Sequence, residues 1–375
     1  MSSTESQTSY AQLRLPSANL AADMDFLIAL GFRLDKIFPA DDPAVAMLSG
    51  YEMHLVLDKR VESPPPIINI ITDYPEEIGD GNSEHTAPNG TIFHIRPKTQ
   101  TLIAPSTLHH FEVRSFDERE PWVIGRAGML YRDLIPDRLG GSIVASHIHV
   151  PDGGPVPDMV HYHTIGFQLI YCYHGWVKLV YEDQGPPFIL KAGDCVTQPP
   201  EIRHRVLEAS DDLHVIEIGV PAEHMTTIDH EMELPTAIFN PERLFQGQRF
   251  CHHQLKDAVW KPWRIPGFEY RETGILEATQ GDANVDVIRP LLIDSTMRNQ
   301  NEPKPQWVTH DTDILFSFVL EGKVVLDVEG QTTQTLQKGE AFVMPPFMKY
   351  ALSKPSADLE FLEVALPGSF VTMLT

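Results

Sequence analysis

The stretch PDMVHYHTIGFQLIYCYHG, residues 157–175, places two histidines two positions apart in a run of β-forming residues. Successive side chains of a strand point to opposite faces, so His161 and His163 are expected to leave the same face of a sheet. A third histidine, His204, ends the segment GDCVTQPPEIRH, which intervening hairpins can bring alongside. Imidazole is the commonest metal ligand, so the pattern predicts a metal site held by three imidazoles.

Gln168 follows His163 by five residues on the same expected run of strand. An uncharged amide is a weak ligand for a divalent ion. We expect Gln168 to be part of the metal and catalytic site, either as a fourth ligand or as a hydrogen-bonding neighbour of the ligands or substrate. The alternative for the histidines is a set of solvated or hydrogen-bonded neutral rings, which is the ordinary state of a lone histidine but fits a pair with a distant third less well.

The residues around this stretch resemble the two signature motifs of the cupin superfamily. The first motif is a Gly-rich lead-in, HxH, four residues, an acidic ligand, six residues and Gly; the second is Gly, Pro and His. The matching positions are Gly154, His161, His163, Gly175, Gly193, Pro199 and His204. Gln168 departs from the family, which usually has Glu there. The resemblance implies a jelly-roll barrel, or double-stranded β-helix, that holds one divalent transition metal ion per chain. Fe(II) is favoured, with Zn, Mn, Ni and Cu as further options.

An internal repeat predicts a second barrel of the same kind. Pro-Trp at 121–122 followed by Tyr-Arg-Asp at 131–133 recurs as Pro-Trp at 262–263 followed by Tyr-Arg-Glu at 270–272, and Gly193 with its two prolines recurs at Gly339. Transferring the motif offsets to the second copy gives the following ligand positions: Val308, His310, Leu315 and Tyr350. One imidazole with two aliphatic residues and a phenol holds a divalent ion poorly, so the second barrel is expected to be metal-free.

Ahead of the barrels, residues 10–58 show the pattern of a small α+β unit. A strand, a helix capped by Ser17 or Asn19 and three further strands are expected, in the order βαβββ. This order resembles one half-module of the glyoxalase, or vicinal oxygen chelate, superfamily. We interpret it as a structural element, a lid or a surface through which two chains form a homodimer.

The sequence thus predicts a mainly β protein with two cupin barrels behind an α+β module. The expected segments are a disordered tail at 1–9, the half-module at 10–58, a Pro/Gly-rich connection at 59–105, a metal-binding barrel at 106–220, an arm with helix-compatible pieces at 221–247 and a metal-free barrel at 248–375.

Composition limits the partners. The chain has 52 acidic and 29 basic residues and a formal net charge of −23, which disfavours nucleic acid and anionic membrane surfaces. It shows neither a spanning apolar run nor a leader pattern, and its three widely spaced cysteines suggest a reducing compartment. A cytoplasmic protein with a small-molecule substrate is expected.

The three-histidine pattern is similar to that of cupin dioxygenases that cleave diketones, aromatic rings or thiol substrates. This resemblance implies a non-haem iron oxidoreductase acting on a small oxygen-chelating substrate. Two other readings stay open at this point. A redox-inert ion in the same cage would give an isomerase, epimerase, lyase or hydrolase, and the same fold also serves non-enzymatic small-molecule binding.

Overall fold

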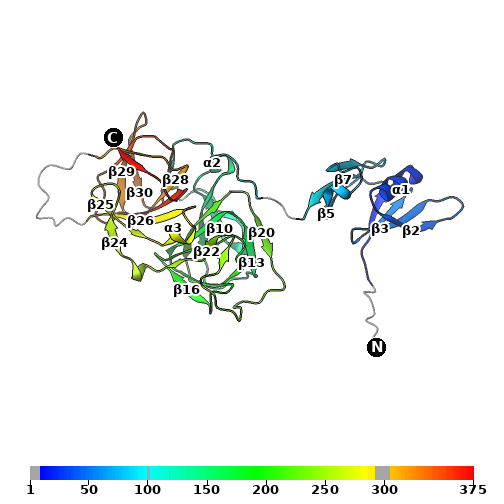
Figure 1. Ribbon diagram of the computed structural model, residues 1–375, viewed down its shortest axis with the longest axis horizontal. Helices are drawn as coiled ribbons and strands as arrows, with labels where there is room; N and C mark the ends of the chain where they lie inside the picture. The colour runs from blue at the N-terminus through cyan, green and yellow to red at the C-terminus, as the bar shows by residue number, and fades with distance from the viewer. Residues whose placement is uncertain (1–8, 99–101, 118, 292–304) are drawn as a thin grey trace, which may run out of the picture. The chain divides into compact units, whose positions relative to one another are not determined.

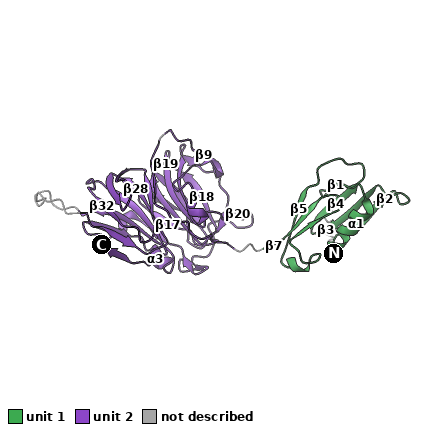
Figure 2. Ribbon diagram, turned by 90° about the horizontal axis from the view of Figure 1, so that it is seen from above, with its two compact units in different colours: residues 1–101 green, residues 102–375 purple. Residues whose placement is uncertain are grey.

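The computed structural model describes residues 9–98, 102–117, 119–291 and 305–375, and it divides the chain into two compact units, residues 1–101 and 102–375 (Figure 2). All but one residue of the tail expected at 1–9 lies outside the described residues. In the part of the chain that the structure describes, no helix is long and apolar enough to cross a membrane.

The first unit begins with the expected βαβββ order. Its four-stranded sheet has the order β1-β4-β3-β2, with β1 and β4 parallel and the other pairs antiparallel. The elements are β1 (Leu13–Pro16), α1 (Leu20–Ala29), β2 (Arg33–Phe38), β3 (Val45–Gly50) and β4 (Met53–Asp58). Asn19 caps α1, because its side chain accepts a hydrogen bond from the Ala22 amide. The likeness to a glyoxalase half-module and the homodimer both stay predictions.

The first unit does not end at residue 58, as expected, but continues through most of the Pro/Gly-rich stretch. Three strands there form a second small sheet in the order β5-β7-β6, and they are β5 (Ile67–Thr72), β6 (Glu84–Thr86) and β7 (Ile92–Pro97). Ile68, Ile70 and Phe93 share one buried cluster with Leu27 of α1 and Leu55 of β4. The alternating apolar residues of β5 and β7 therefore complete a core, which outweighs the loop-like composition around them.

The second unit contains two jelly-roll barrels, which confirms the mainly β class (Figure 1). The first barrel has a seven-stranded sheet in the order β23-β17-β14-β19-β11-β10-β9 and a smaller sheet in the order β16-β15-β18-β13-β20, where β12 also pairs with β18. Its strands are β9 (Val123–Ile124), β10 (Leu130–Asp133), β11 (Val144–Val150), β12 (Gly154–Pro155), β13 (His161–Thr164), β14 (Phe167–His174), β15 (Trp176–Tyr181), β16 (Phe188–Lys191), β17 (Cys195–Thr197), β18 (His204–Ala209), β19 (Leu213–Val220), β20 (Met225–Ile228) and β23 (His252–His253).

The second barrel repeats this arrangement strand for strand, as the sequence repeat predicts. Its sheets have the orders β24-β25-β26-β33-β28-β31-β8 and β30-β29-β32-β27-β34. Its strands are β8 (Glu112–Arg114), β24 (Trp260–Pro262), β25 (Phe268–Glu272), β26 (Asn284–Pro290), β27 (Val308–His310), β28 (Ile314–Glu321), β29 (Lys323–Val328), β30 (Gln334–Gln337), β31 (Ala341–Met344), β32 (Tyr350–Ser353), β33 (Glu360–Leu366) and β34 (Thr372–Leu374). The short helices α2 (Arg138–Gly141) and α3 (Ile275–Ala278) and the hairpin of β21 (Leu244–Phe245) and β22 (Gln248–Arg249) complete the unit.

The two barrels exchange their edge strands. β8 precedes the first barrel in the chain but pairs with β31 of the second, and β23 precedes the second barrel but pairs with β17 of the first. The expected boundaries at 106–220 and 248–375 therefore cut through both sheets. The apolar pattern of the sequence can indicate a short strand such as β8 or β23, but it does not show with which strand that element pairs.

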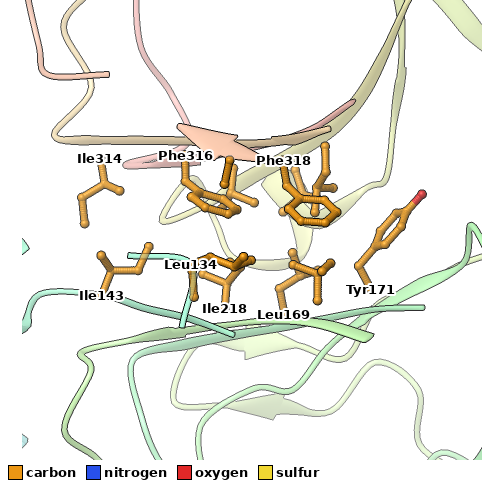
Figure 3. Close-up of a cluster of buried hydrophobic side chains, with 14 of the residues drawn as sticks. Leu134, Ile143, Leu169, Tyr171, Ile218, Ile314, Phe316 and Phe318 are labelled. Carbon is orange, nitrogen blue, oxygen red and sulfur yellow. The ribbon is translucent and has the colours of Figure 1, made fainter. Parts of the chain in front are cut away.

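The large sheets of the two barrels pack face to face through one shared core. Leu169 and Ile218 of the first barrel lie opposite Phe316 and Phe318 of the second (Figure 3). Tyr171 belongs to the same cluster, so alternate residues of β14 face away from the interior of their own barrel. Each barrel also has an inner core of its own.

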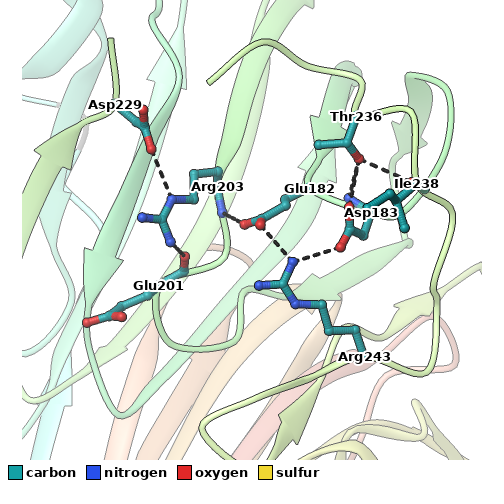
Figure 4. Close-up of polar contacts among 8 residues, drawn as sticks. All are labelled: Glu182, Asp183, Glu201, Arg203, Asp229, Thr236, Ile238 and Arg243. Carbon is teal, nitrogen blue, oxygen red and sulfur yellow. Dashed lines mark hydrogen bonds and ion pairs between the residues drawn. The ribbon is translucent and has the colours of Figure 1, made fainter. Parts of the chain in front are cut away.

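The arm at 221–247 lies along the first barrel as an extended segment, not as the helical pieces expected from its composition. Its Thr226, Thr227 and Ile228 are β-branched and form β20, which pairs with β13. Arg243 of the arm donates hydrogen bonds to Glu182 and Asp183 of the barrel (Figure 4). Sheet pairing and these ion pairs outweigh the weak helix propensity of the segment.

Candidate metal centre

The three histidines expected to converge do so. His161 and His163 lie on β13, and His204 begins β18, where it pairs directly with His161. The ring centroids are 4.2 Å apart for His161 and His204, and 5.2 Å apart for the other two pairs. One nitrogen from each ring lies within 4.8 Å of the others. A single ion therefore fits between the three rings.

Hydrogen bonds at the Nδ1 atoms orient these rings. The Nδ1–H groups of His161 and His204 donate to the carbonyl oxygens of Met159 and Ile202 at 2.8 and 2.9 Å, since a carbonyl can only accept. His163 Nδ1 lies 2.9 Å from Thr226 Oγ1. This fixes Nε2 of His161 as a lone pair, and that atom is buried without a hydrogen-bond partner in the described structure. Such outer hydrogen bonds are typical of metal-ligating histidines.

Burial keeps the three rings neutral. It lowers the pKa of His163 to about 3 and also lowers the pKa of His161 and of His204, and the neighbouring rings and the Arg126 guanidinium add to the effect. A metal ligand must be the unprotonated imidazole, so the site is prepared for an ion without first losing protons. The donor set fits a divalent transition metal.

Gln168 is buried and hydrogen-bonded to Glu217, a residue for which the sequence shows no motif. Its Nε2 donates to Glu217 Oε1 at 2.6 Å, and its Oε1 is buried without a hydrogen-bond partner among the described residues. Burial raises the pKa of Glu217, and the Gln168 hydrogen bond opposes this rise. Direct ligation by Gln168 stays a prediction. The only signal for Glu217 is one acid in the apolar run LHVIEIGV.

A cavity of about 80 Å³ lies inside the first barrel, and His163, His204 and Glu217 line it. Its walls are mostly aliphatic, and its other polar residues include Arg126, Tyr131, Tyr181 and Gln198. Arg126 forms an ion pair with the buried Asp158. Tyr171 and Tyr173 lie at odd offsets from Gln168 on β14 and do not line this cavity. Tyr131 and Tyr181, which do line it, come from β10 and β15.

The second barrel has the same backbone register with different side chains. Val308 pairs with Tyr350, just as His161 pairs with His204. His310 is fully buried, and its Nε2 lies 3.1 Å from the Met344 carbonyl oxygen. Over the described residues, no group of three potential metal ligands includes a residue of β27 or β32, the counterparts of β13 and β18. The metal-free second barrel stays a prediction.

An ion pair between Arg264 and Glu363 lies in the second barrel. Ser317 pairs with Glu363, just as Ile170 pairs with Glu217, so Glu363 is the counterpart of Glu217. Both of its carboxylate oxygens accept hydrogen bonds from Arg264, each at 2.6 Å. This pairing raises the pKa of Arg264 against the opposing effect of burial. A side-chain cation thus neutralises the interior acid of this barrel.

Asp286 next to this pair supplies a test of the buried charges. Burial and the Glu363 carboxylate raise its pKa from 3.8 to about 7. Because the pKa of Asp286 is raised, its contribution to the free energy of unfolding is fully present below about pH 4 and is lost as the pH rises to about 7. Asp286→Asn is therefore expected to raise the free energy of unfolding by on the order of 2–4 kcal/mol at pH 8 and to change it little at pH 4.

Thermal denaturation of the Asp286→Asn variant at both pH values checks this prediction. Glu329→Gln, at an exposed position of the same barrel, is the control and should show no such pH dependence. A variant that is less stable than the original chain at pH 8 would contradict the assignment.

No protein-family model matches the chain, and no curated protein matches it. Solved structures of similar fold include protein Ylba from E. coli, with 12% identity, coverage of 71% of this chain and 95% of that chain, and a TM-score of 0.48. Salicylate 1,2-dioxygenase from Pseudaminobacter salicylatoxidans has 15% identity, coverage of 73% and 90%, and a TM-score of 0.49. A mutant of oxalate decarboxylase from Bacillus subtilis has 13% identity, coverage of 73% and 80%, and a TM-score of 0.47. The jelly-roll architecture of the two barrels rests on their own sheet orders. Similarity at this level says nothing about the activity of this protein.

Proposed function

We propose that this protein is a metal-dependent oxidoreductase, a non-haem iron dioxygenase that acts on a small oxygen-chelating substrate. The observation that carries the proposal is the convergence of three buried, neutral imidazoles at the wall of a small, mostly apolar cavity. Iron(II) in such a site supplies open coordination positions and one-electron chemistry.

The neutral ligand set favours an anionic substrate. None of the three imidazoles reduces the 2+ charge of an ion, so a deprotonated diketone, phenol or thiol would be the favoured chelate. The aliphatic walls of the cavity, which include Ile148, Ile170 and Val206, would hold the body of the substrate and exclude water. Arg126 adds positive charge at the same cavity, although Asp158 balances part of it.

Glu217 provides the proton-transfer group. Burial raises the pKa of its carboxyl above that of an ordinary glutamate, which is the direction that a general base requires. Gln168 holds Oε1 of Glu217 through its amide, so it acts as a positioning residue for this acid. In the proposed reaction, Glu217 accepts the proton that the substrate loses when it binds as an anion.

Glu217 also favours a second candidate function. An isomerase or lyase with a redox-inert ion needs an acid or base beside the bound carbonyl, and Glu217 lines the cavity together with His163 and His204.

Metal analysis combined with oxygen consumption distinguishes these functions. We expect the purified chain to carry iron in the first barrel and to consume oxygen with at least one member of a panel of β-diketones, catechols, hydroxy-aromatic acids and thiols. Glu217→Gln should lower this turnover by about 100-fold, with the metal content unchanged.

The opposing outcomes are equally definite. Zinc in that site without oxygen consumption would overturn the dioxygenase in favour of the isomerase or lyase. A carefully prepared chain that neither contains nor takes up a transition metal there would overturn every enzymatic function proposed for the site.

A further inference from the structure

A second group of histidines lies on the large sheet of the first barrel, on the face that points away from the cavity. His149 of β11 pairs directly with His214 of β19, and His214 also pairs with His174 of β14. Glu217 faces the metal cavity, whereas His214, at an odd offset from it, faces the other side. Asp212 stands in the turn before β19. Three adjacent strands and a turn thus bring four potential ligands together.

The ligand atoms converge on a small volume. Nε2 of His149 and Nε2 of His214 lie 2.9 and 3.2 Å from the same oxygen, Oδ1 of Asp212. Ligand atoms of these three residues all lie within 4.8 Å of one another. Nε2 of His174 lies 3.9 Å from the other carboxylate oxygen of Asp212. Three imidazoles and one carboxylate are a donor set that suits Zn²⁺.

We call His149, His174, His214 and Asp212 the outer cluster. Buried side chains pack against two of its rings. His147 is 4% exposed, and its Nε2 lies 2.9 Å from His214 Nδ1. When His214 Nε2 is a ligand, its Nδ1–H donates to His147 Nε2, which fixes the orientation of the ring. The indole of Trp122 packs at 5.2 Å from the His147 ring and 5.4 Å from the His149 ring, measured between centroids. These contacts restrict the rings of His149 and His214, whereas the side chain of His174 is 62% exposed.

Access from solvent remains open on the ligand side. The side chains of His149 and His214 are 18% and 20% exposed, and that of Asp212 is 63% exposed. An ion can therefore enter without opening the fold. The outer cluster also differs from the three-histidine centre in having a carboxylate, which offsets part of the charge of a bound ion.

The second barrel serves as an internal comparison. Its β26 and β33 pair in the register that β11 and β19 show, with Val287 opposite Leu362 where the first barrel has His147 opposite Ile216. The positions of His149 and His214 then correspond to Arg289 and Glu360. The histidines are thus a property of the first barrel alone and not a requirement of the fold.

We propose that His149, His214 and Asp212, with His174 as the fourth ligand, form a second site for a divalent metal ion of the zinc type. It is separate from the His161–His163–His204 centre, because the inner ligands come from β13 and β18 of the smaller sheet, whereas the outer ligands lie on or next to the large sheet, on its face away from the cavity. An ion there joins β11, β19 and β14 at the end of the inter-barrel core, so it stabilises the folded chain.

Calorimetric titration of the full chain with Zn²⁺ tests the site. The metal-free chain is expected to bind two ions, one at each centre. His149→Ala/His214→Ala should bind one ion fewer, with affinity for that ion reduced by on the order of 100-fold or more. Zn²⁺ should raise the denaturation temperature of a His161→Ala/His163→Ala variant, and this rise should disappear when the two outer replacements are added. His230→Ala, at an exposed histidine outside the cluster, is the matched control and should bind like the original chain.

Equal stoichiometry in the original chain and the His149→Ala/His214→Ala variant would overturn the proposal. This comparison does not require the His161→Ala/His163→Ala variant to fold. Loss of both ions on replacing His161 and His163, in a variant with unchanged circular dichroism, would likewise overturn it. The outcome is independent of the proposed reaction, because zinc binding is measured without substrate.

Discussion

His163→Ala is expected to weaken transition-metal binding at the inner centre by on the order of 100-fold. Metal binding to a protein site of several ligands is worth about 10–16 kcal/mol, so each ligand accounts for roughly 3 kcal/mol. The remaining rings, His161 and His204, keep their hydrogen bonds to Met159 and Ile202, so the fold around the centre is retained. Elemental analysis of the protein after dialysis against a weak chelator measures the loss.

The second barrel supplies the matched control for this variant. His310 occupies the position of His163, because Val308 and Tyr350 pair as His161 and His204 do. His310→Ala also removes a buried imidazole and should leave the metal content unchanged. Thr226→Val removes only the outer partner of His163 and should weaken binding by about 10- to 100-fold. Equal metal retention in His163→Ala and His310→Ala would contradict the centre.

Arg264→Met is expected to lower the free energy of unfolding by about 3–5 kcal/mol. The change leaves Glu363 buried without its cation, next to Asp286, whose own pKa is already raised by Glu363. Arg264→Met/Glu363→Met removes both charges and should recover most of the loss, because apolar residues of similar volume replace a buried ion pair at little cost. Urea denaturation of the single and double variants measures both quantities.

The outcome for the double variant decides what the ion pair does. Recovery of stability would show that Arg264 serves to neutralise Glu363 and that the second barrel needs no ion. A double variant as unstable as Arg264→Met would contradict this, since the loss would then come from packing around the Arg264 side chain, which also lies over the Trp263 ring. The control is Lys323→Met at an exposed position of β29, where no comparable change is expected.

The inner histidines could be predicted from the sequence because two simple rules place them. The alternation of a strand puts His161 and His163 on one face, and the motif spacing assigns His204 to the neighbouring strand. The same offsets identify Val308 and Tyr350, whose pairing in the structure repeats that of His161 and His204. The sequence therefore shows that the corresponding positions of the second barrel hold one histidine and not three.

Glu217 could not be predicted in the same way. A single acid in an apolar strand has no spacing signal, and its importance comes from its contact with Gln168 on another strand. The outer histidines have the same difficulty, because His149, His174 and His214 are far apart in sequence and meet only through the order β11-β19-β14. The alternating isoleucines of the segments 67–72 and 92–97 favour strands even among the surrounding prolines and glycines, but the pattern does not reveal that these strands share a core with α1 and β4.

The exchange of β8 and β23 bears on how such a chain can arise. A protein of one barrel with the same arrangement would complete its sheet only with the leading strand of an identical neighbour, and both copies would have to change together whenever the gene changed. Joining the two copies in one polypeptide removes that symmetry. One half is then free to keep its imidazoles for an ion, while the other has Val308 and Tyr350 at two of the matching positions, pairs its interior carboxylate with Arg264 and remains as scaffold.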